Sequence, residues 1–200
     1  MIHDGKSQND KIFDAFESGM YEFCHYLCLE EIKANPKNAF AWFYKGKTEF
    51  ECNDYVDSIK SFMKGISIEP EATLFRANLG LSFENIGDNK QAIKYYFLEV
   101  RKFPESLYGW QVIVPFLVNN SRYNFAKKIC DEMVKSGTMD YNFLAEEYSE
   151  CLYQAGTLNE ELLFYKKLKE LNYHAPWAQE NYNLLLKDIN NDSGTDLERS

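Results

Sequence analysis

The sequence predicts an all-α fold of repeated helical hairpins, because three series of residues recur with a single period. The first series consists of prolines that lie 34 residues apart: Pro36, Pro70 and Pro104. The second consists of turn-forming residues with the same step of 34 and a last step of 35: Gly19, Asn53, Gly87, Ser121 and Gly156. The third consists of tyrosines one period and then two periods apart: Tyr21, Tyr55 and Tyr123.

Each period has room for two helices and two turns. Glycine and asparagine can adopt the left-handed conformation that closes a helix, so Gly19, Asn53 and Gly87 mark the end of a first helix. Proline cannot continue a helix and moves its predecessor out of the helical conformation, so the three prolines mark the end of a second helix. Pro115 falls inside an expected first helix, which we expect it to kink.

The composition is that of a folded chain with an acidic surface. Of 200 residues, 45% are hydrophobic and 16% aromatic, more than a disordered chain contains. The net charge of −9 disfavours a phosphate backbone or an anionic membrane as the main partner. The longest apolar run, residues 112–118, is too short to span a bilayer. Five cysteines without an apolar leader predict reduced thiols and a cytoplasmic location.

On these registers the chain resembles the tetratricopeptide repeat (TPR) family, whose pattern is W-x2-L-G-x2-Y, then A-x3-F, then P. Residues 39–72 match the pattern with Trp42, Gly46, Ser58, Phe62, Gly65 and Pro70. Residues 73–106 match it with Leu79, Gly80, Phe83, Gly87, Ala92, Tyr96 and Pro104. Lys45 and Glu49 replace the expected Leu and Tyr, so we expect neither to serve as core, and Arg76 replaces the expected Trp.

The resemblance implies a right-handed α-α superhelix, a TPR solenoid, of about five helix-turn-helix repeats and a C-terminal capping helix. The expected repeats are 5–38, 39–72, 73–106, 107–140 and 141–174, with the capping helix at about 176–190. The capping helix is expected to seal the last repeat with one apolar stripe: Tyr182, Leu185, Leu186 and Ile189. We expect a single domain over 1–190 and a flexible polar tail, 191–200.

The resemblance also implies that the first helices line a concave groove that holds a partner segment. In the stretch FAWFY, residues 40–44, Trp42 lies on one side of the helix, while Phe40 and Phe43 lie on nearly the opposite side. Equivalent positions complete the predicted groove face: Phe40, Phe43, Tyr44, Lys47, Leu74, Asn78, Leu81, Tyr108, Gln111 and Val112. Contiguous large apolar side chains indicate an interface, although each aromatic could equally pack in the core.

The ends of the groove are expected to be acidic. Repeat 1 contributes Asn9, Asp10 and Phe13, and repeat 5 contributes Glu146, Glu147 and Glu150, which we interpret as a solvated acidic face. Many TPR proteins hold acidic chaperone C-termini with a clamp of Lys, Arg and Asn, of which only Asn78 is present here. The expected partner is therefore another protein, with an apolar or amphipathic segment that could carry basic flanks. We expect no nucleic acid and no membrane insertion.

The sequence contains no motif for catalysis, metal or cofactor binding. Cys24, His25 and Cys28 could supply part of a zinc site, but no further ligands stand at a suitable spacing, and we interpret the thiols as core. Phosphate-binding glycine motifs are absent. The predicted function is a non-catalytic protein-protein interaction module: a scaffold, adaptor or client chaperone. The alternatives are an RNA-binding helical-repeat protein, a self-associating structural protein or homo-oligomer, and an enzyme with a helical wall.

Overall fold

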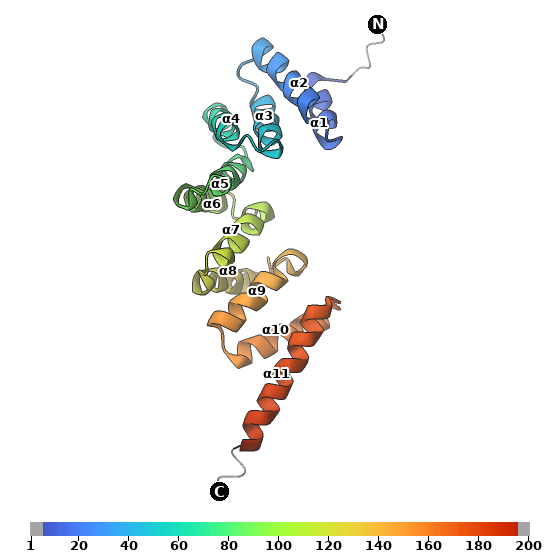
Figure 1. Cartoon of the computed structure of the whole chain (residues 1–200), viewed down its shortest axis with the longest axis vertical. Coiled ribbons are helices and arrows are strands. Elements are labelled where there is room, and N and C mark those ends of the chain that lie inside the picture. The colour runs from blue at the N-terminus through green and yellow to red at the C-terminus, as the bar shows by residue number, and fades with distance from the viewer. Residues whose placement is uncertain (1–5, 196–200) are drawn as a thin grey trace. The chain divides into compact units, whose positions relative to one another are not determined.

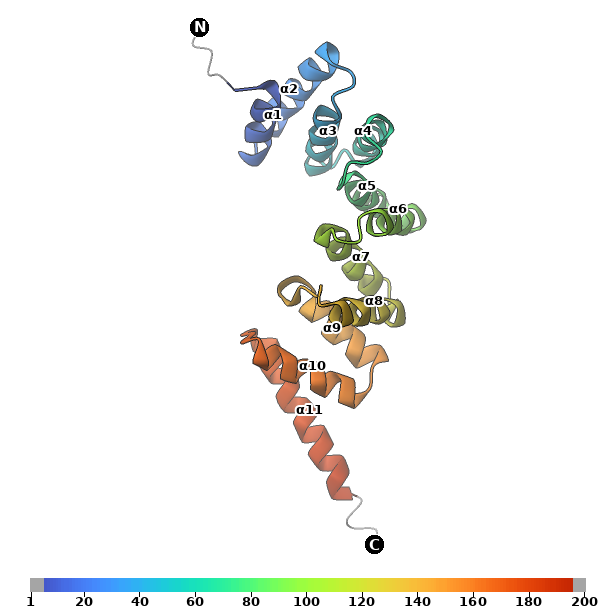
Figure 2. The ribbon, with the colours of Figure 1, turned by 180° about the vertical axis from the view of Figure 1, so that it is seen from behind.

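A computed structural model describes residues 6–195, and for residues 188–195 only the backbone. This part of the chain forms eleven helices (Figures 1 and 2). They are α1 (Gln8–Glu17), α2 (Tyr21–Ala34), α3 (Ala39–Glu51), α4 (Tyr55–Ile68), α5 (Phe75–Asn85), α6 (Asn89–Lys102), α7 (Leu107–Asn119), α8 (Tyr123–Ser136), α9 (Tyr141–Ala155), α10 (Leu158–Glu170) and α11 (Pro176–Thr195). Contacts divide the chain into two compact units, Met1–Ile113 and Val114–Ser200.

The helices fall in pairs that match the predicted repeats. The pair α1 and α2 lies within 5–38, and each later pair up to α9 and α10 lies within its own predicted repeat. The helix expected at 176–190 is α11, which continues to Thr195. Residues 191–195 thus continue the helix past the expected boundary at 190, while 196–200 and the side chain of Ile189 lie outside the described part. The single-domain boundary stays a prediction.

The turn inside each early hairpin is closed by a left-handed residue, as the sequence predicts. Gly19, Asn53, Gly87 and Ser121 have φ of 69°, 65°, 80° and 56°. The residue after each donates its N–H to the carbonyl five positions back, which satisfies an otherwise free helix-end oxygen; these bonds are 2.8–2.9 Å long for Met20, Asp54, Asp88 and Arg122. Gly156 differs, because its backbone is extended, with φ −96° and ψ −170°.

The turn between repeats is held by a bond that also recurs every 34 residues. The side-chain nitrogens of Trp42, Arg76 and Trp110 donate to carbonyl oxygens six residues earlier, over 3.0, 2.6 and 2.9 Å. The acceptors are Pro36, Pro70 and Pro104. Arg76 thus reproduces the bond of the Trp that it replaces, which explains how the repeat tolerates that departure.

Close crossing of the paired helices depends on glycine. A Cβ at Gly46 would lie 2.8 Å from the ring of Phe62, and one at Gly80 would lie 2.5 Å from the ring of Tyr96. Both rings are fully buried. Glycine therefore provides the space that each ring fills.

Lys45 and Glu49 were not expected to serve as core, but both face the contact between α3 and α4. Glu49 is only 7% exposed and forms an ion pair with Lys45. Ser61 on α4 donates to Glu49 Oε2 over 2.5 Å and accepts from Lys45 Nζ over 3.0 Å. The expectation that these charges leave the core was wrong, since each group neutralises or hydrogen-bonds another. We call Lys45, Glu49 and Ser61 the polar triad.

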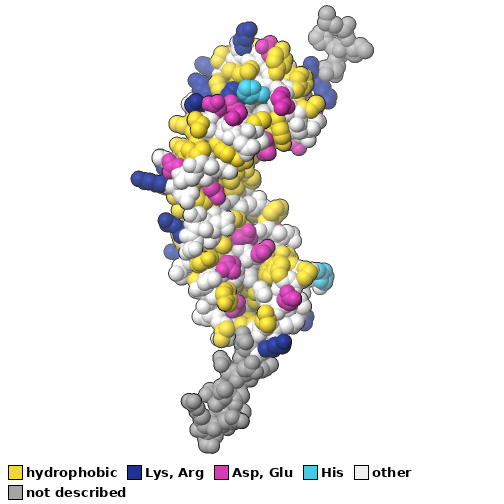
Figure 3. Space-filling model, viewed as in Figure 1, with side chains coloured by type: hydrophobic (Ala, Val, Ile, Leu, Met, Phe, Trp, Pro, Cys, Tyr) yellow, Lys and Arg dark blue, Asp and Glu magenta, His cyan; other side chains and the backbone are white. Residues whose placement is uncertain are grey.

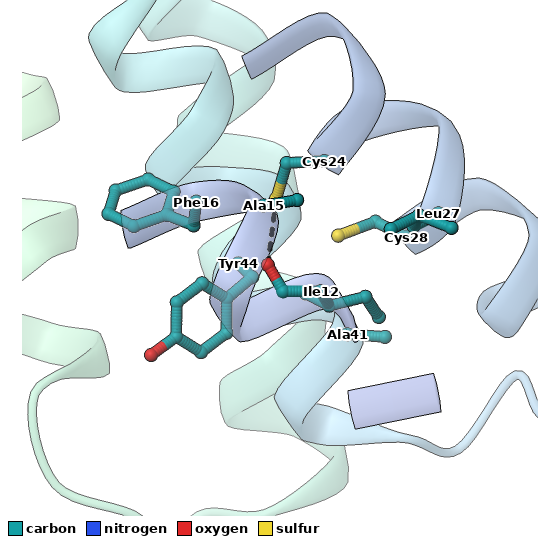
Figure 4. Packing of buried hydrophobic residues seen from close by; sticks show 8 residues of the cluster. All are labelled: Ile12, Ala15, Phe16, Cys24, Leu27, Cys28, Ala41 and Tyr44. Carbon is teal, nitrogen blue, oxygen red and sulfur yellow. Dashed lines mark hydrogen bonds between the residues drawn. The ribbon is translucent and has the colours of Figure 1, made fainter. Parts of the chain in front are cut away.

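The N-terminal end of the first unit has its own apolar core (Figure 4). Cys24 and Cys28 are fully buried in it, and the Cys24 thiol donates to the carbonyl oxygen of Ile12 over 3.5 Å. Both thiols therefore lie among core side chains. In the described part of the chain, no three His, Cys, Asp or Glu side chains form a group that could hold a metal ion.

The helix α7 contains Pro115, and the boundary between the two units also falls within it. The helix continues to Asn119, so the proline does not end it. The proline has no N–H to offer the carbonyl of Gln111, so one helical bond is lost there. The kink predicted at this point stays a prediction.

The second unit is built from neighbouring contacts of α8 with α9, α9 with α10, and α10 with α11. Lys127 of α8 holds this arrangement through ion pairs with Asp131 (2.9 Å) and with Glu160 of α10 (2.7 Å). The Tyr148 hydroxyl donates to Asp131 over 2.5 Å. None of the described helices combines the length and the apolar content needed to cross a lipid bilayer.

Candidate protein-binding surfaces

All ten residues of the predicted groove face lie in the first unit, on or immediately before α3, α5 and α7. Nine of them are partly buried and Tyr44 is buried. We call the nine partly buried residues the α3/α5/α7 face: Phe40, Phe43, Lys47, Leu74, Asn78, Leu81, Tyr108, Gln111 and Val112.

Tyr44 belongs to the core rather than to the open face. It is 8% exposed, and its ring lies 5.4 Å from that of Phe16 and 6.0 Å from that of Phe13, both on α1. Figure 4 shows the ring beside Phe16 with the hydroxyl directed away from the cluster. Burial, with a smaller contribution from the charge of Glu17, raises the pKa of this hydroxyl. The angular position of Tyr44 on α3 could not reveal that α1 covers it.

Phe40 and Phe43 each have one side on the core and the remainder accessible. The ring of Phe43 lies 5.0 Å from that of Phe75 and 5.9 Å from that of Phe62. The ring of Phe40 lies 4.6 Å from that of Tyr44. These ring contacts hold both side chains in place, so a partner would meet an ordered apolar surface.

Lys47 adds a positive charge to the same face. Its ammonium group lies 4.1 Å from the ring centroid of Phe16 and 5.7 Å from that of Tyr44, within the range of a cation–π contact. Burial lowers the pKa of this amine, whereas the nearby carboxylates of Glu17 and Glu51 act in the opposite direction. The side chain is thus held by aromatic rings rather than by a close ion pair.

Polar groups on α5 and α7 form a second part of the face. The Asn78 amide donates to the Leu74 carbonyl over 2.8 Å, and the Tyr108 hydroxyl donates to Asn78 Oδ1 over 3.4 Å. Burial raises the pKa of Tyr108, and the charge of Glu99 raises it further. These contacts leave part of the hydrogen-bonding capacity of the Asn78 amide unused.

A buried carboxylate supports the start of α5. Leu74 adopts a left-handed conformation with φ 73°, and its N–H donates to Glu99 Oε1 over 2.7 Å. Glu99 is fully buried, and its other oxygen has no hydrogen-bond partner. Burial raises the pKa of this carboxyl, although the Leu74 N–H and the charge of Arg76 act against that rise. The hydrogen bond to the Glu99 carboxylate therefore stabilises the left-handed conformation of Leu74.

The second unit contains two adjoining cavities of about 480 and about 390 Å³. Both are lined by Ser149, Glu150 and Asn181, so they form one continuous groove. The sequence pattern identified Glu146, Glu147 and Glu150 of this groove, but not Glu161 or the apolar walls. Tyr153 stood at the right spacing to be found, seven residues after Glu146 on the same helix face. Trp177 and Leu184 come from α11, and no local pattern connects them to α9.

Comparison with known proteins identifies the repeat. No protein-family model and no curated protein matches the sequence, but solved structures share its fold. A TPR protein from Parabacteroides merdae has a TM-score of 0.68 and 14% identity over 96% of this chain and 77% of that chain. A TPR protein of Thermus thermophilus has a TM-score of 0.61 and 14% identity over 90% of this chain and 97% of that chain.

A third similar structure is a protein assembly. It is Naa15/Naa10 bound to HypK-THB, with a TM-score of 0.65 and 13% identity over 91% of this chain. The present chain spans 29% of the length of that neighbour. Hairpins with a period of 34, glycine-to-ring crossings and a partly exposed apolar face define a helical-repeat protein. The particular fold is that of the tetratricopeptide repeat: this chain folds as an all-α TPR solenoid.

Proposed function

We propose that the chain is a non-catalytic protein-protein interaction module that binds an apolar segment of a partner protein against the α3/α5/α7 face. The observation that carries this proposal is the partial exposure of Phe40 and Phe43, whose rings are fixed by the core yet remain accessible. Leu81 and Val112 are also partly exposed and extend the apolar surface onto α5 and α7.

The arrangement favours binding because little order has to be created. Rings that already rest on Phe75 and Tyr44 lose little side-chain freedom when a partner covers them. Covering apolar area contributes about 25 cal/mol per Å² before the costs of association. The amides of Asn78 and Gln111 supply polar groups that can meet the backbone of a bound segment, which fixes its register.

A role as scaffold, adaptor or client chaperone follows from this kind of surface. At the level of the fold, the similar chain in the Naa15/Naa10–HypK assembly supports a protein as the partner. All five cysteines are free thiols, which supports a reducing compartment such as the cytoplasm. The acidic net charge of −9 supports a protein rather than a nucleic acid.

The test compares two triple variants in the full chain. Phe40→Gln, Leu81→Gln and Val112→Thr alter the α3/α5/α7 face while sparing the buried Tyr44. Val56→Gln, Met63→Gln and Leu98→Gln are the matched control, on exposed positions of α4 and α6 that are 58%, 50% and 39% accessible. Helicity and the urea midpoint are recorded for both variants.

Partners are captured from lysate with and without nuclease treatment, and the main one is purified and titrated by calorimetry. Binding that is lost in the face variant and kept in the control supports the proposal. Equal binding by both variants contradicts it. Capture that disappears with nuclease, followed by filter binding of RNA at low salt, would indicate the RNA-binding alternative. Sedimentation across concentrations separates self-association from binding to a different protein.

A further inference from the structure

The groove of the second unit combines carboxylates with apolar walls. Its acidic residues are Glu146, Glu147, Glu150 and Glu161. Its apolar walls include Tyr153, Leu158 and Leu184, which are 73%, 51% and 56% exposed, and Trp177. We call these eight residues the acidic groove. On the face seen in Figure 3, carboxylates and apolar side chains are interspersed over the region of α9 and α10.

The four carboxylates carry no matching positive charge. The side chains that line the two cavities include no Lys, Arg or His, and no ion pair in the described part of the chain involves any of the four. Glu150 accepts a hydrogen bond from the neutral side-chain amide of Gln154 over 2.9 Å. Glu146, Glu147 and Glu150 are neighbours on α9, so their charges repel one another.

One oxygen of these carboxylates is already removed from water. Glu147 Oε2 is buried and has no hydrogen-bond partner. Burial raises the pKa of this carboxyl, and the charge of Glu146 acts in the same direction. An unpaired buried acceptor has a free-energy cost, which a donor from outside the chain would relieve.

Elsewhere in the second unit, several acidic side chains have cationic partners. Glu160 pairs with Lys127 at 2.7 Å, Glu132 with Lys135 at 2.9 Å, and Glu170 with Lys167 at 3.3 Å. Lysines therefore pair with several carboxylates on α8 and α10, but none of the residues that line the groove is a lysine. The groove lacks the ion pairs that these other carboxylates form.

From this charge complementarity we propose that the acidic groove docks a basic amphipathic helix of a partner protein. Its apolar stripe would rest on Tyr153, Leu158 and Leu184, while its Lys or Arg side chains would meet the carboxylates of α9. A second copy of this chain fits less well, because its net charge is also −9. The groove lies wholly within the second unit and is independent of the α3/α5/α7 face.

The experiment measures fluorescence anisotropy of a labelled helical peptide of about 14 residues, in which Leu and Lys form opposite stripes. A second peptide has every Lys replaced by Glu. Each is titrated with the full chain at low salt and at about 0.5 M salt, where exposed charges are screened within a few Å. The Lys peptide is expected to bind at low salt and weaken with salt, and the Glu peptide is expected not to bind.

Two variants with the same change in net charge locate the binding. Glu146→Gln, Glu147→Gln and Glu150→Gln should weaken the Lys peptide at least about ten-fold, because three charge pairs are lost. The control variant carries Glu30→Gln, Glu69→Gln and Glu105→Gln, at exposed positions that form no ion pair in the described part of the chain. It should bind like the wild type. Tyr153→Ser with Leu184→Ser should also weaken binding without removing charge.

Three outcomes would overturn the proposal. Equal weakening by both charge variants would show unspecific attraction to an acidic protein. Equal binding of the Lys and Glu peptides would show an apolar contact alone. Displacement of the Lys peptide by millimolar Ca²⁺, with Ca²⁺ bound by wild type but not by the groove variant, would show a cation site instead. The face variant, which carries Phe40→Gln, leaves the acidic groove intact. Its result therefore tests the proposed function separately from binding at the acidic groove.

Discussion

The hairpins α3–α4 and α5–α6 occupy equivalent repeat positions but fill them with opposite chemistry. Lys45, Glu49 and Ser61 of the first correspond, 34 residues later, to Leu79, Phe83 and Tyr95 of the second. In the second hairpin, Phe83 and Tyr95 stack with centroids 5.4 Å apart and an interplanar angle of 1°. In the first, the same two positions are joined by the bond from Ser61 to Glu49. In these two hairpins the crossing is filled by side chains that contact each other, and an aromatic pair or a hydrogen-bonded polar pair can fill it.

Breaking the polar triad should have the largest effect. Glu49→Ala leaves Lys45 without its carboxylate in a largely buried place, and should lower the free energy of unfolding by about 3–5 kcal/mol. Urea denaturation measures the loss. The control is Asp57→Ala, which removes an exposed, solvent-screened pair with Lys60 and should cost far less than Glu49→Ala. Similar losses in both variants would mean that the triad is not a buried unit.

Converting one hairpin to the chemistry of the other is the next test. Lys45→Leu, Glu49→Phe and Ser61→Tyr together should leave stability unchanged or raise it by about 1–4 kcal/mol, because desolvated charges are replaced by apolar packing. Thermal and urea unfolding of the triple variant check this. A loss of stability larger than that of Glu49→Ala would show that the two hairpins differ in shape as well as in chemistry.

Arg76 offers a smaller test of equivalence. Arg76→Trp restores the residue of the other repeats and keeps a donor for the Pro70 carbonyl, so the free energy of unfolding should change by at most about 1 kcal/mol. Arg76→Leu, which has no donor, should cost more, because the Pro70 carbonyl loses its bond of 2.6 Å. If both variants unfolded at the same urea concentration, the bond would contribute nothing.

The finest test is the pH dependence that Glu99 of the second hairpin contributes. Burial raises the pKa of Glu99 in the folded chain above its ordinary value of 4.5, so the folded state binds this proton more tightly than the unfolded state. Stability should then fall as pH rises from that ordinary value to the folded pKa, and level off above it. Glu99→Gln removes this fall. Its stability relative to wild type should rise with pH across that window, whereas a constant difference would contradict the raised pKa.

The sequence predicted the helical hairpins well because their boundaries depend on local signals. Left-handed Gly19 and Asn53 and the inter-repeat prolines act within a few residues of where they stand. Tyr44 was misplaced because its burial depends on α1, whose Phe13 and Phe16 are far from it in sequence. The angular positions of residues around one helix do not show which other helix will pack against them.

The polar triad and the walls that α10 and α11 contribute to the acidic groove were beyond prediction for the same reason. Glu49 looks unsuited to a core until Ser61, twelve residues away, is placed beside it. The groove draws its walls from α9, α10 and α11, and only their packing brings Tyr153 and Leu184 to one cavity. From the charges alone we interpreted these residues as a solvated face. The apolar walls, which the sequence did not reveal, show that they line a groove instead.

The hydrogen bonds from Trp42, Arg76 and Trp110 to the proline carbonyls fix the length of the segment between successive hairpins. Each fixes how many residues can pass between one hairpin and the next, so an inserted residue would pull donor and acceptor out of reach. After Ser121 the step lengthens to 35, and at the next equivalent positions stand Leu144 and Ala145, neither of which can donate a side-chain bond. We therefore expect the length of the repeat to vary most where this hydrogen bond is missing. Inserted residues should be tolerated first in the segment before Leu144.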